Sequence, residues 1–240
     1  MKEEEVKKLT DFMKQLGYNF CDPQLLFTAL CHSSYAHEER QRGRKDVESN
    51  ERLEFLGDAV VDLLIAEHLY RNYPQAPEGI MSKIKAAAAS EDALALIAKD
   101  IGLNRYIFLG HGEELNDGRE RESILSGALE ALAAAIYLDG GMKPLSEILI
   151  PHLVRYIEQI AAGRIVFDHK TALQELAQEK YKTLPEYVLV REEGPAHMKK
   201  FFVEVRLKGR SLATGEGSSI KDAEKNAARL ALERLKEMED

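Results

Sequence analysis

The sequence predicts an all-α domain followed by a small α-β-β-β-α domain, and two patterns indicate this division. From about residue 5 to residue 150, apolar positions recur at intervals of three and four, which is the period of amphipathic helices. After residue 185, two runs alternate between apolar and polar residues and are rich in β-branched and aromatic types, as strands are. At 240 residues the chain is long enough for two domains.

The first domain is expected to span residues 1–160 and to consist of successive helices. The expected helices are 4–16, 23–30, 48–72, 79–100, 123–138 and 144–161. Helix-breaking sequences lie between them, namely Asn72-Tyr73-Pro74, Pro77-Glu78-Gly79, Gly110-His111-Gly112, Asn116-Asp117-Gly118 and Asp139-Gly140-Gly141. Because strand-like alternation is nearly absent here, this part of the chain is expected to be all-α.

The second domain is expected over residues 168–240, after a short linker over residues 161–167. Its expected elements are a helix over 170–180, strands over 186–191, 201–207 and 211–214, and a helix over 218–238. The third strand is expected to end at Gly215-Glu216-Gly217.

The net charge of −8 argues at first against a nucleic-acid partner, but the charge is unevenly distributed. Residues 168–240 hold 14 basic and 14 acidic side chains, which leaves 19 of the 33 basic and 27 of the 41 acidic residues in the first part. The whole excess of negative charge therefore lies before Asp168. An acidic first domain can be an ordinary solvated surface, or it can contain carboxylates that bind divalent cations.

No apolar stretch approaches the roughly 20 residues that a membrane-spanning helix requires. The chain starts with the acidic sequence Met1-Lys2-Glu3-Glu4-Glu5, whereas a secretory signal has a basic start followed by an apolar core. We therefore expect no membrane association and a cytoplasmic protein. The two cysteines, Cys21 and Cys31, lie in no metal-binding pattern and are expected to be buried as small apolar side chains.

The segment from Asn50 to Asp62 is the most informative part of the sequence. On a helix, Glu51, Glu54 and Asp58 fall within a sector of about 60°, because steps of three and four residues return to the same face. Three like charges on one stripe disfavour a helix slightly, which suggests a purpose other than local stability. A solvated acidic face is the simplest alternative. The many apolar neighbours favour burial instead, and buried carboxylates need a cation or hydrogen-bond donors.

The helix expected over 123–138 is almost entirely apolar apart from Glu130. A single acid in such surroundings is either part of a structural salt bridge or a functional group. Brought together, Glu54, Asp58 and Glu130 would offer the hard oxygen ligands that magnesium accepts, with water and phosphate oxygens completing its shell. This set suits phosphodiester hydrolysis, in which bound metals activate water and neutralise charge at phosphorus.

The run from Asn50 to Val60 closely resembles the signature of the ribonuclease III family. Further matches are His32-Ser33-Ser34-Tyr35, Pro77-Glu78-Gly79, Leu109-Gly110-His111-Gly112-Glu113-Glu114, Ser123-Ile124-Leu125 and Ala135-Ile136-Tyr137-Leu138-Asp139-Gly140-Gly141. The resemblance covers essentially the whole chain. It is to the bacterial type, which joins an all-α nuclease domain to a double-stranded-RNA-binding domain.

The resemblance implies a magnesium-dependent endoribonuclease of double-stranded RNA, in which manganese can replace magnesium. Glu54, Asp58 and Glu130 match metal-binding carboxylates of the family, and Asp58 and Glu130 are expected to be catalytic. Glu51 and Glu78 match further acids near the cleavage site.

The resemblance also implies a homodimer whose subunits meet at the helix that carries Glu51 to Phe55. Each subunit would contribute one catalytic site, and each site would cut one strand of the duplex. The expected products carry 5′-phosphate and 3′-hydroxyl ends, and the expected role is processing of ribosomal and messenger RNA precursors.

Gly127 departs from the family pattern, which has Asp three residues before the glutamate of this helix. A metal ligand is therefore expected to be missing, and glycine weakens a helix interior by about 1 kcal/mol relative to alanine. Two outcomes are open: the change inactivates the enzyme, or water replaces the carboxylate, since magnesium commonly keeps several waters. The rival function is thus a catalytically impaired double-stranded-RNA-binding protein.

The second domain resembles a double-stranded-RNA-binding domain over residues 168–237. The matching segments are Thr171-Ala172-Leu173-Gln174-Glu175, Pro185-Glu186-Tyr187, Gly194-Pro195-Ala196-His197, Gly215-Glu216-Gly217-Ser218-Ser219 and Lys221-Asp222-Ala223-Glu224-Lys225-Asn226-Ala227-Ala228. Such domains read the shape of the A-form duplex through two minor grooves and the phosphates between them.

Three separate contacts with RNA are expected. Gln174 and Gln178, one turn apart on the first helix, would reach 2′-hydroxyls and base edges. The loop that presents His197 would enter a second minor groove. Lys221 and Lys225 would meet phosphates near the positive end of the last helix. Taken singly, each of these side chains could equally be an ordinary solvent-exposed group.

Overall fold

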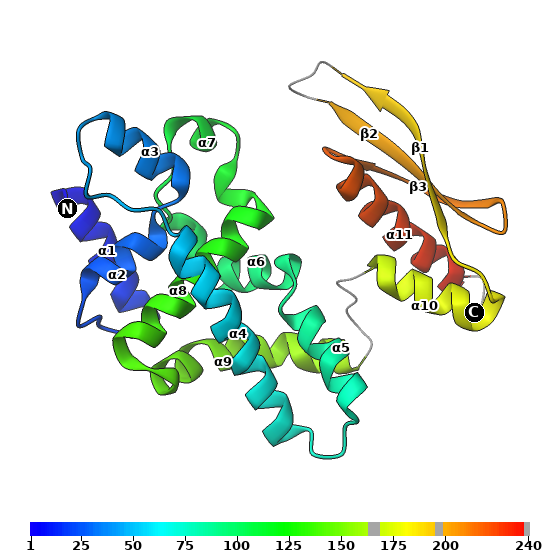
Figure 1. Cartoon of the computed structure of the whole chain (residues 1–240), viewed down its shortest axis with the longest axis horizontal. Helices are drawn as coiled ribbons and strands as arrows, with labels where there is room; N and C mark the ends of the chain where they lie inside the picture. The colour runs from blue at the N-terminus through cyan, green and yellow to red at the C-terminus, as the bar shows by residue number, and fades with distance from the viewer. Residues whose placement is uncertain (163–168, 195–198, 238–240) are drawn as a thin grey trace. The chain divides into compact units, whose positions relative to one another are not determined.

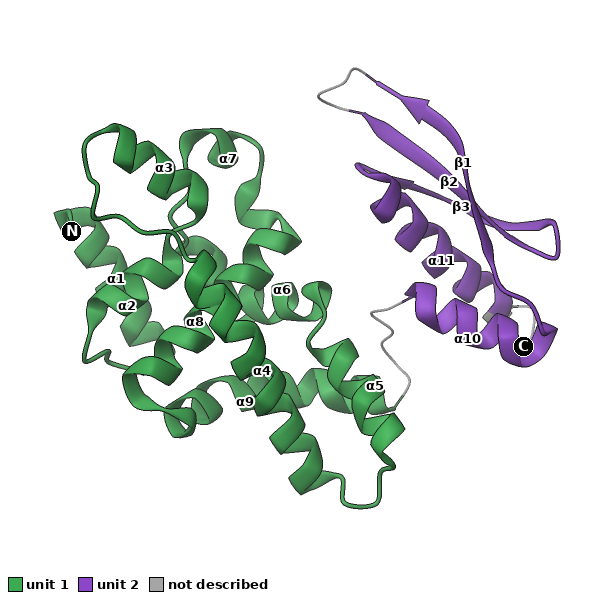
Figure 2. Ribbon diagram, in the orientation of Figure 1, with its two compact units in different colours: residues 1–165 green, residues 166–240 purple. Residues whose placement is uncertain are grey.

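The computed structural model describes residues 1–162, 169–194 and 199–237, and the chain divides into two compact units, residues 1–165 and 166–240 (Figures 1 and 2). The first unit is helical and the second combines helices with a sheet, which confirms the predicted fold class. Most of the expected linker over residues 161–167 lies outside the described residues.

The first unit is built around α8, a helix that is buried along most of its length. The described α-helices are α1 (Glu3–Leu16), α2 (Pro23–Leu30), α3 (Ser33–Gln41), α4 (Glu51–Asn72), α5 (Glu78–Ala88), α6 (Glu91–Asp100), α7 (His111–Leu115), α8 (Glu122–Gly140) and α9 (Met142–Ala161). Helix α8 packs against α2, α4, α6 and α9 (Figure 1). Its run of buried alanines, including Ala131 and Ala133, lets these neighbours approach closely.

The predicted helix over 79–100 is wrong, because this segment forms two helices, α5 and α6, that separate at Ala89 and Ser90. The hydroxyl oxygen of Ser90 accepts a hydrogen bond from the backbone N–H of Ala93 at 3.3 Å. Ser90 therefore acts as an N-cap, which starts a new helix. Helix α3 was not expected, because its mostly polar sequence carries no clear apolar period.

Helix α7 begins at His111, where the sequence indicated a break at Gly110-His111-Gly112. The backbone N–H of His111 donates a hydrogen bond to Oε1 of Glu38 in α3 at 2.6 Å. An ideal Cβ atom on Gly110 would lie 2.9 Å from the carbonyl oxygen of Ser34. Gly110 thus marks a close contact between α3 and α7 rather than an irregular loop.

Cys31 is buried as expected, but Cys21 is exposed, so the prediction for Cys21 is wrong. The backbone N–H groups of Cys21 and Asp22 donate hydrogen bonds to the carboxylate of Asp139 at 3.0 and 2.8 Å. This turn is therefore held by its backbone, and the Cys21 side chain remains at the surface.

The second unit consists of two helices and a three-stranded antiparallel sheet in the order β1-β2-β3. Its elements are α10 (His169–Tyr181), β1 (Glu186–Glu193), β2 (Lys200–Leu207), β3 (Arg210–Gly217) and α11 (Ile220–Glu237). Helix α11 packs against β2, β3 and α10. The buried core of this unit is formed by Leu173, Val205, Ala227, Ala228, Ala231, Leu232 and Leu235.

Strand β3 extends to Gly217, beyond its predicted end at 214. An ideal Cβ atom on Gly215 would lie 2.2 Å from the backbone nitrogen of Ala227, and one on Gly217 would lie 2.4 Å from that of Ala223. These glycines belong to the strand, where the missing side chains allow α11 to lie directly against it. The expectation that Gly215-Glu216-Gly217 ends the strand is therefore wrong.

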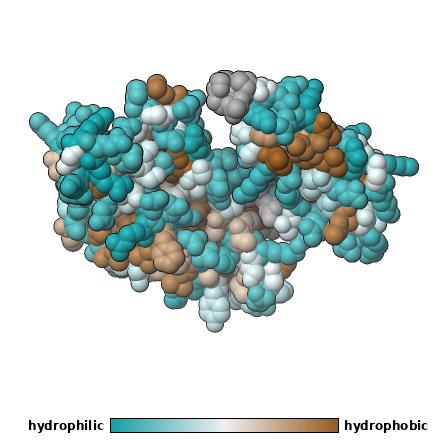
Figure 3. All heavy atoms as spheres, turned by 45° about the horizontal axis from the view of Figure 1, so that its top comes forward, coloured by the Kyte–Doolittle hydropathy of each residue, from teal (hydrophilic) through white to brown (hydrophobic). Residues whose placement is uncertain are grey.

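One described helix, α8, is long and apolar enough to span a membrane when only length and composition are considered. In this structure 67% of its most apolar window is buried inside the first unit, as in the core helix of a folded domain. On the face shown in Figure 3, hydrophilic residues predominate and hydrophobic residues form separate patches.

Candidate active site

Helices α4 and α8 approach each other very closely at Gly57. An ideal Cβ atom on Gly57 would lie 1.8 Å from the backbone carbonyl oxygen of Glu130 and 2.9 Å from its Cα atom. A larger residue would have to push the helices apart, because the neighbouring atoms belong to the backbone. The contact places Glu130 beside the part of α4 that carries Glu54 and Asp58.

The side chain of Glu54 reaches from α4 to α8 at Gly127. An ideal Cβ atom on Gly127 would lie 2.8 Å from Oε2 of Glu54 and 3.2 Å from its Oε1. The carboxylate of Glu54 therefore lies over the bare backbone of Gly127, in space that a larger side chain would use. Position 127 faces the same group of carboxylates as Glu130.

Glu130 is half-buried, and several other acids lie near it. Burial raises the pKa of Glu130 to about 7, and nearby negative charges add to this effect. These charges belong, in decreasing order of effect, to Asp58, Glu54, Asp62 and Glu91. The structure thus brings the three predicted metal ligands into one electrostatic cluster, which we call the carboxylate cluster: Glu54, Asp58 and Glu130.

The donor set of the carboxylate cluster fits magnesium, which prefers charged oxygen ligands. Within the described part of the chain, its three carboxylates make no ion pair with a basic side chain. No group of three or more Asp, Glu, His or Cys side chains among the described residues is close enough to form a finished metal site.

Two further acids near Glu130, Asp62 and Glu91, were not predicted. Asp62 lies one turn after Asp58 on α4, and its carboxylate pairs with Nζ of Lys85 in α5 at 2.5 Å. The four-residue spacing from Asp58 could have indicated it. Glu91 is the first residue of α6, and only the packing of α6 against α8 brings it near Glu130.

Glu51 and Glu78, the other two predicted acids, are both exposed. Glu51 accepts a hydrogen bond from Oγ of Ser49 at 2.6 Å, and Glu78 accepts one from Oγ of Ser82 at 2.8 Å. Burial and then the charge of Glu51 raise the pKa of Glu54, so Glu51 lies close to the carboxylate cluster. Glu78, at the start of α5, is not among the charges that shift Glu54 or Glu130 most strongly.

Four of the five predicted RNA-binding residues lie on helices α10 and α11. Gln174 and Gln178 are exposed one turn apart on α10. Lys221 is exposed in the first turn of α11, and Lys225 is half-buried one turn later. His197 lies outside the described residues.

The start of α11 is fixed by two serines. The backbone N–H of Asp222 donates a hydrogen bond to Oγ of Ser219 at 3.1 Å, and Oγ of Ser218 donates one to Oδ2 of Asp222 at 2.8 Å. Ser219 therefore caps the helix, and Lys221 is held at its positive end. A cation in this position is well placed to meet a phosphate group.

Phe55 is the most exposed large hydrophobic side chain among the described residues, with 83% of its surface exposed. A pocket of about 520 Å³ borders the same helix. Its apolar lining consists of Leu25, Leu53, Leu56 and Leu138. The rest of the lining is polar or charged, including Asp46, Glu48 and Arg52. An exposed aromatic ring on a helix that also borders a partly apolar pocket is typical of a surface that contacts another protein.

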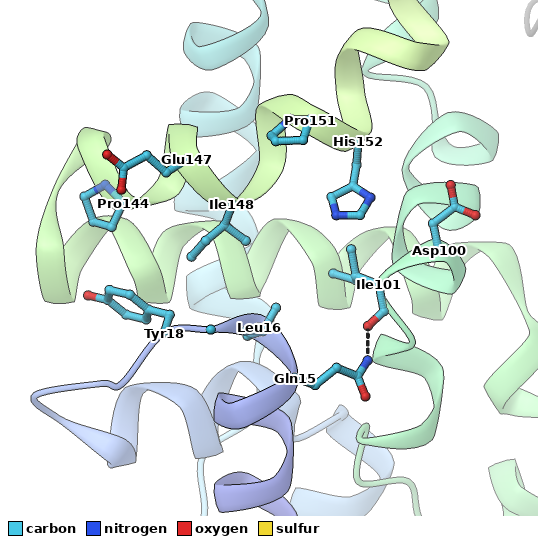
Figure 4. A pocket seen from close by; sticks show the side chains of 11 residues that line it. Gln15, Leu16, Tyr18, Asp100, Ile101, Pro144, Glu147, Ile148, Pro151 and His152 are labelled. Atoms are coloured by element: carbon cyan, nitrogen blue, oxygen red, sulfur yellow. Dashed lines mark hydrogen bonds between the residues drawn. The ribbon is translucent and has the colours of Figure 1, made fainter.

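A second pocket, of about 490 Å³, is lined by none of the residues predicted to bind metal or RNA. Figure 4 shows the His152 ring of α9 pointing toward Ile101. The amide Nε2 of Gln15 donates a hydrogen bond to the carbonyl oxygen of Ile101 at 2.5 Å. This pocket lies where the end of α1 meets α6 and α9.

Family models match both units of the chain. The model described as ribonuclease-III-like matches residues 22–157, and the model described as double-stranded RNA binding motif matches residues 169–235. Ribonuclease 3 of Pseudothermotoga lettingae is 61% identical over 98% of this chain and 99% of that protein. Ribonuclease 3 of Borreliella burgdorferi is 44% identical over 97% of this chain and 93% of that protein.

Solved structures resemble the helical unit. The nuclease domain of ribonuclease III from Campylobacter jejuni is 38% identical, with a TM-score of 0.54, and the match covers 63% of this chain and 97% of that one. That structure concerns flexibility in a region involved in dimer formation. A second structure of the same nuclease domain is 39% identical, also with a TM-score of 0.54.

Proposed function

Because this chain belongs to the ribonuclease III family, we propose that it is an endoribonuclease that cleaves double-stranded RNA with the help of a divalent cation. The observation that supports this function best is the carboxylate cluster of Glu54, Asp58 and Glu130. The contact at Gly57 assembles it from two helices, in a chain whose second unit matches a double-stranded RNA binding motif. Hydrolysis at phosphorus with departure of the 3′-oxygen leaves 5′-phosphate and 3′-hydroxyl ends.

Glu54, Asp58 and Glu130 are the residues that would hold the cation, which we assign to magnesium, with manganese as a substitute. When bound, magnesium supplies an activated water and neutralises charge at phosphorus. Asp58 is exposed and accessible to a phosphate group, whereas Glu130 is half-buried where α8 packs against α4. We assign the catalytic role to these two carboxylates. Glu51 and Glu78 would stay near the RNA without binding the cation directly.

The second unit would hold the duplex. Gln174 and Gln178 are exposed on one face of α10 and offer amide groups to a minor groove. His197 would serve a second minor groove. Lys221 and Lys225, at the start of α11, would neutralise phosphates between the grooves.

The protein would act as a homodimer through α4. Phe55 exposes 83% of its surface and lies on the helix that borders the pocket lined by Leu53 and Leu56. In a twofold arrangement, Phe55 of each subunit would enter the partner's pocket and remove both apolar surfaces from water. Two subunits provide two carboxylate clusters, one for each RNA strand.

A catalytically impaired binding protein is not favoured as the alternative. Gly127 removes one carboxylate, but Glu54, Asp58 and Glu130 remain together, and Glu54 itself occupies the space beside Gly127. Magnesium commonly keeps several waters, so water can complete its shell. The cellular role we propose is processing of ribosomal and messenger RNA precursors in the cytoplasm.

Cleavage of a long RNA duplex in the presence of magnesium tests this function. The protein should release fragments with 5′-phosphate ends, and Glu130→Gln should abolish cleavage while duplex affinity stays nearly unchanged. Glu67→Gln changes a half-exposed acid on a later turn of α4, so it is the matched control and should cleave normally. Full cleavage by Glu130→Gln, or none by the unmodified protein, would contradict the proposal.

A further inference from the structure

The end of strand β3 lies directly against the first two turns of α11 (Figure 1). An ideal Cβ atom on Gly217 would lie 2.4 Å from the backbone nitrogen of Ala223, and one on Gly215 would lie 2.2 Å from that of Ala227. Glu216 stands between these two glycines in the strand. Its backbone is therefore held close to the turn of α11 that contains residues 223–227.

Asn226 makes a hydrogen bond across this contact. Its side-chain Nδ2 donates to the backbone carbonyl oxygen of Glu216 at 2.8 Å. The two residues are ten positions apart in the sequence, so the bond closes a loop that contains the connection from β3 to α11. Lys221, which we expect to meet a phosphate, lies inside this loop.

The two other side-chain hydrogen bonds described at this helix start are local. Ser219 accepts from the backbone N–H of Asp222, and Ser218 donates to the Asp222 carboxylate. These bonds shape the first turn of α11 but do not reach β3. The amide of Asn226 does reach β3, so it fixes where the first turn lies relative to the sheet.

The position of this turn matters because a lysine ammonium is carried on a long and flexible side chain. Lys221 is exposed in the first turn, and Lys225 immediately precedes Asn226. A contact between a side chain and a phosphate is stronger when the backbone that carries the side chain is already in place before binding. A helix start that moves against the sheet would lose part of this advantage.

We propose that Asn226 is a positioning residue for RNA binding: by joining α11 to the end of β3, it holds Lys221 where its ammonium group meets a phosphate of the duplex. The proposal rests on the proposed function, since it concerns the same RNA contact. The simpler alternative is a hydrogen bond that only stabilises the second unit.

The test is the affinity of the full-length protein for an RNA duplex of about 16 base pairs, the length that such a domain spans, measured over a range of salt concentrations. A chelator prevents cleavage. Asn226→Ala should flatten the slope of log affinity against log salt by nearly 1, as Lys221→Ala should, because one phosphate contact is lost. Alanine is the best helix former, so this change does not weaken α11 itself.

A double-mutant cycle separates positioning from general stability. In the Lys221→Ala background, Asn226→Ala should flatten the slope no further, because the contact that depends on Asn226 is already absent. The two substitutions are then coupled. A hydrogen bond that only stabilises the unit would lower its thermal stability without such coupling.

Arg234 provides the matched control. Its Nη1 donates a hydrogen bond to the carbonyl oxygen of Leu212 at 2.7 Å, so it also joins α11 to β3. It lies about 20 Å along the helix from Lys221. Arg234→Ala removes a similar bond, and its effect on duplex affinity should simply add to that of Lys221→Ala.

The proposal is overturned if Lys221→Ala flattens the salt slope while Asn226→Ala leaves it unchanged, or if the effects of these two substitutions are additive. If Lys221→Ala itself leaves the slope unchanged, the phosphate contact in the proposed function fails, and the role of Asn226 fails with it. The two failures are therefore distinguishable.

Discussion

An ideal Cβ atom on Gly127 of α8 would lie 2.8 Å from Oε2 of Glu54 in α4. The carboxylate of Glu54 therefore lies in the space that a side chain at position 127 would use. The neighbour of Gly127 is the end of a flexible side chain and not backbone. A residue larger than glycine can therefore be accommodated if Glu54 turns away, and substitution at this position should be compatible with folding.

Gly127→Asp should increase duplex cleavage and lower the magnesium concentration needed for half-maximal cleavage by about tenfold, because it adds a carboxylate to the cluster. A magnesium titration of the cleavage rate measures both. Gly127→Ala is the control: it fills the same space without adding a ligand and should give no such gain. If the unmodified protein cleaves as fast as Gly127→Asp at low magnesium, position 127 is not a ligand position in this chain.

Gly57→Ala should destabilise the first unit by about 1–3 kcal/mol or more, as overpacking of a tight interior does. The added methyl group would lie 1.8 Å from a backbone oxygen of Glu130, so α4 and α8 must move apart. Denaturant unfolding monitored by circular dichroism measures the change. Gly79→Ala is the control, since nothing lies within 4 Å of its Cβ position, and it should be neutral or stabilising. If Gly57→Ala and Gly79→Ala had the same free energy of unfolding, the close contact between α4 and α8 at Gly57 would be contradicted.

Glu130 should make the metal-free protein less stable as the pH rises. Burial raises the folded-state pKa of Glu130 to about 7, above its ordinary value of 4.5, so folding favours the protonated form. The stability contributed by this group is fully present below about pH 4.5 and is lost as the pH rises through about 7, with a slope of up to about 1.4 kcal/mol per pH unit.

Glu130→Gln removes this titration, so its stability relative to the unmodified protein should rise between pH 5 and 7.5. Urea unfolding in the presence of a chelator measures the difference at each pH. Added magnesium should reduce it, because a bound cation favours the ionised form. A difference that does not change with pH would mean that Glu130 titrates normally.

Phe55→Ser should convert the dimer into monomers, because it removes the apolar ring that we expect to enter the partner subunit. Sedimentation at micromolar concentration should give about 27.0 kDa for the variant and twice that mass for the unmodified protein. Tyr70→Ser is the matched control, because Tyr70 is also an aromatic residue of α4 and is 76% exposed. It should remain dimeric, and a monomeric unmodified protein would contradict the prediction.

Lys221→Ala combined with Lys225→Ala should weaken duplex binding and flatten the slope of log affinity against log salt by nearly 2, since two phosphate contacts are lost. Arg210→Ala is the control. Arg210 is exposed at the start of β3, at the opposite end of that strand from the first turn of α11, and its loss should leave the slope unchanged. An unchanged slope in the double variant would exclude the phosphate role of these lysines.

The sequence by itself determined the fold class, the family and the identity of most ligand candidates. These properties follow from local information: apolar periods show helices and strands, and a dense signature such as Asn50 to Val60 identifies a family without any coordinates. The positions of Gln174, Gln178 and Lys221 on exposed helix faces followed in the same way. Helix starts that depend on a single capping residue are harder to predict from apolar periods. The break at Ser90 and the short helix after Gly110 were therefore missed.

Only the tertiary structure decided which groups act on one another. Glu91 is far from Glu130 in the sequence and reaches it through the packing of α6 on α8, and the ion pair between Asp62 and Lys85 depends on α5 folding back along α4. The sequence carried no expectation for Gly57 and predicted that a strand ends at Gly215, yet each of these glycines marks a place where two backbones touch. Sequence patterns describe one element at a time, whereas charge interaction and steric contact depend on distances between elements, which are fixed only when the core packs.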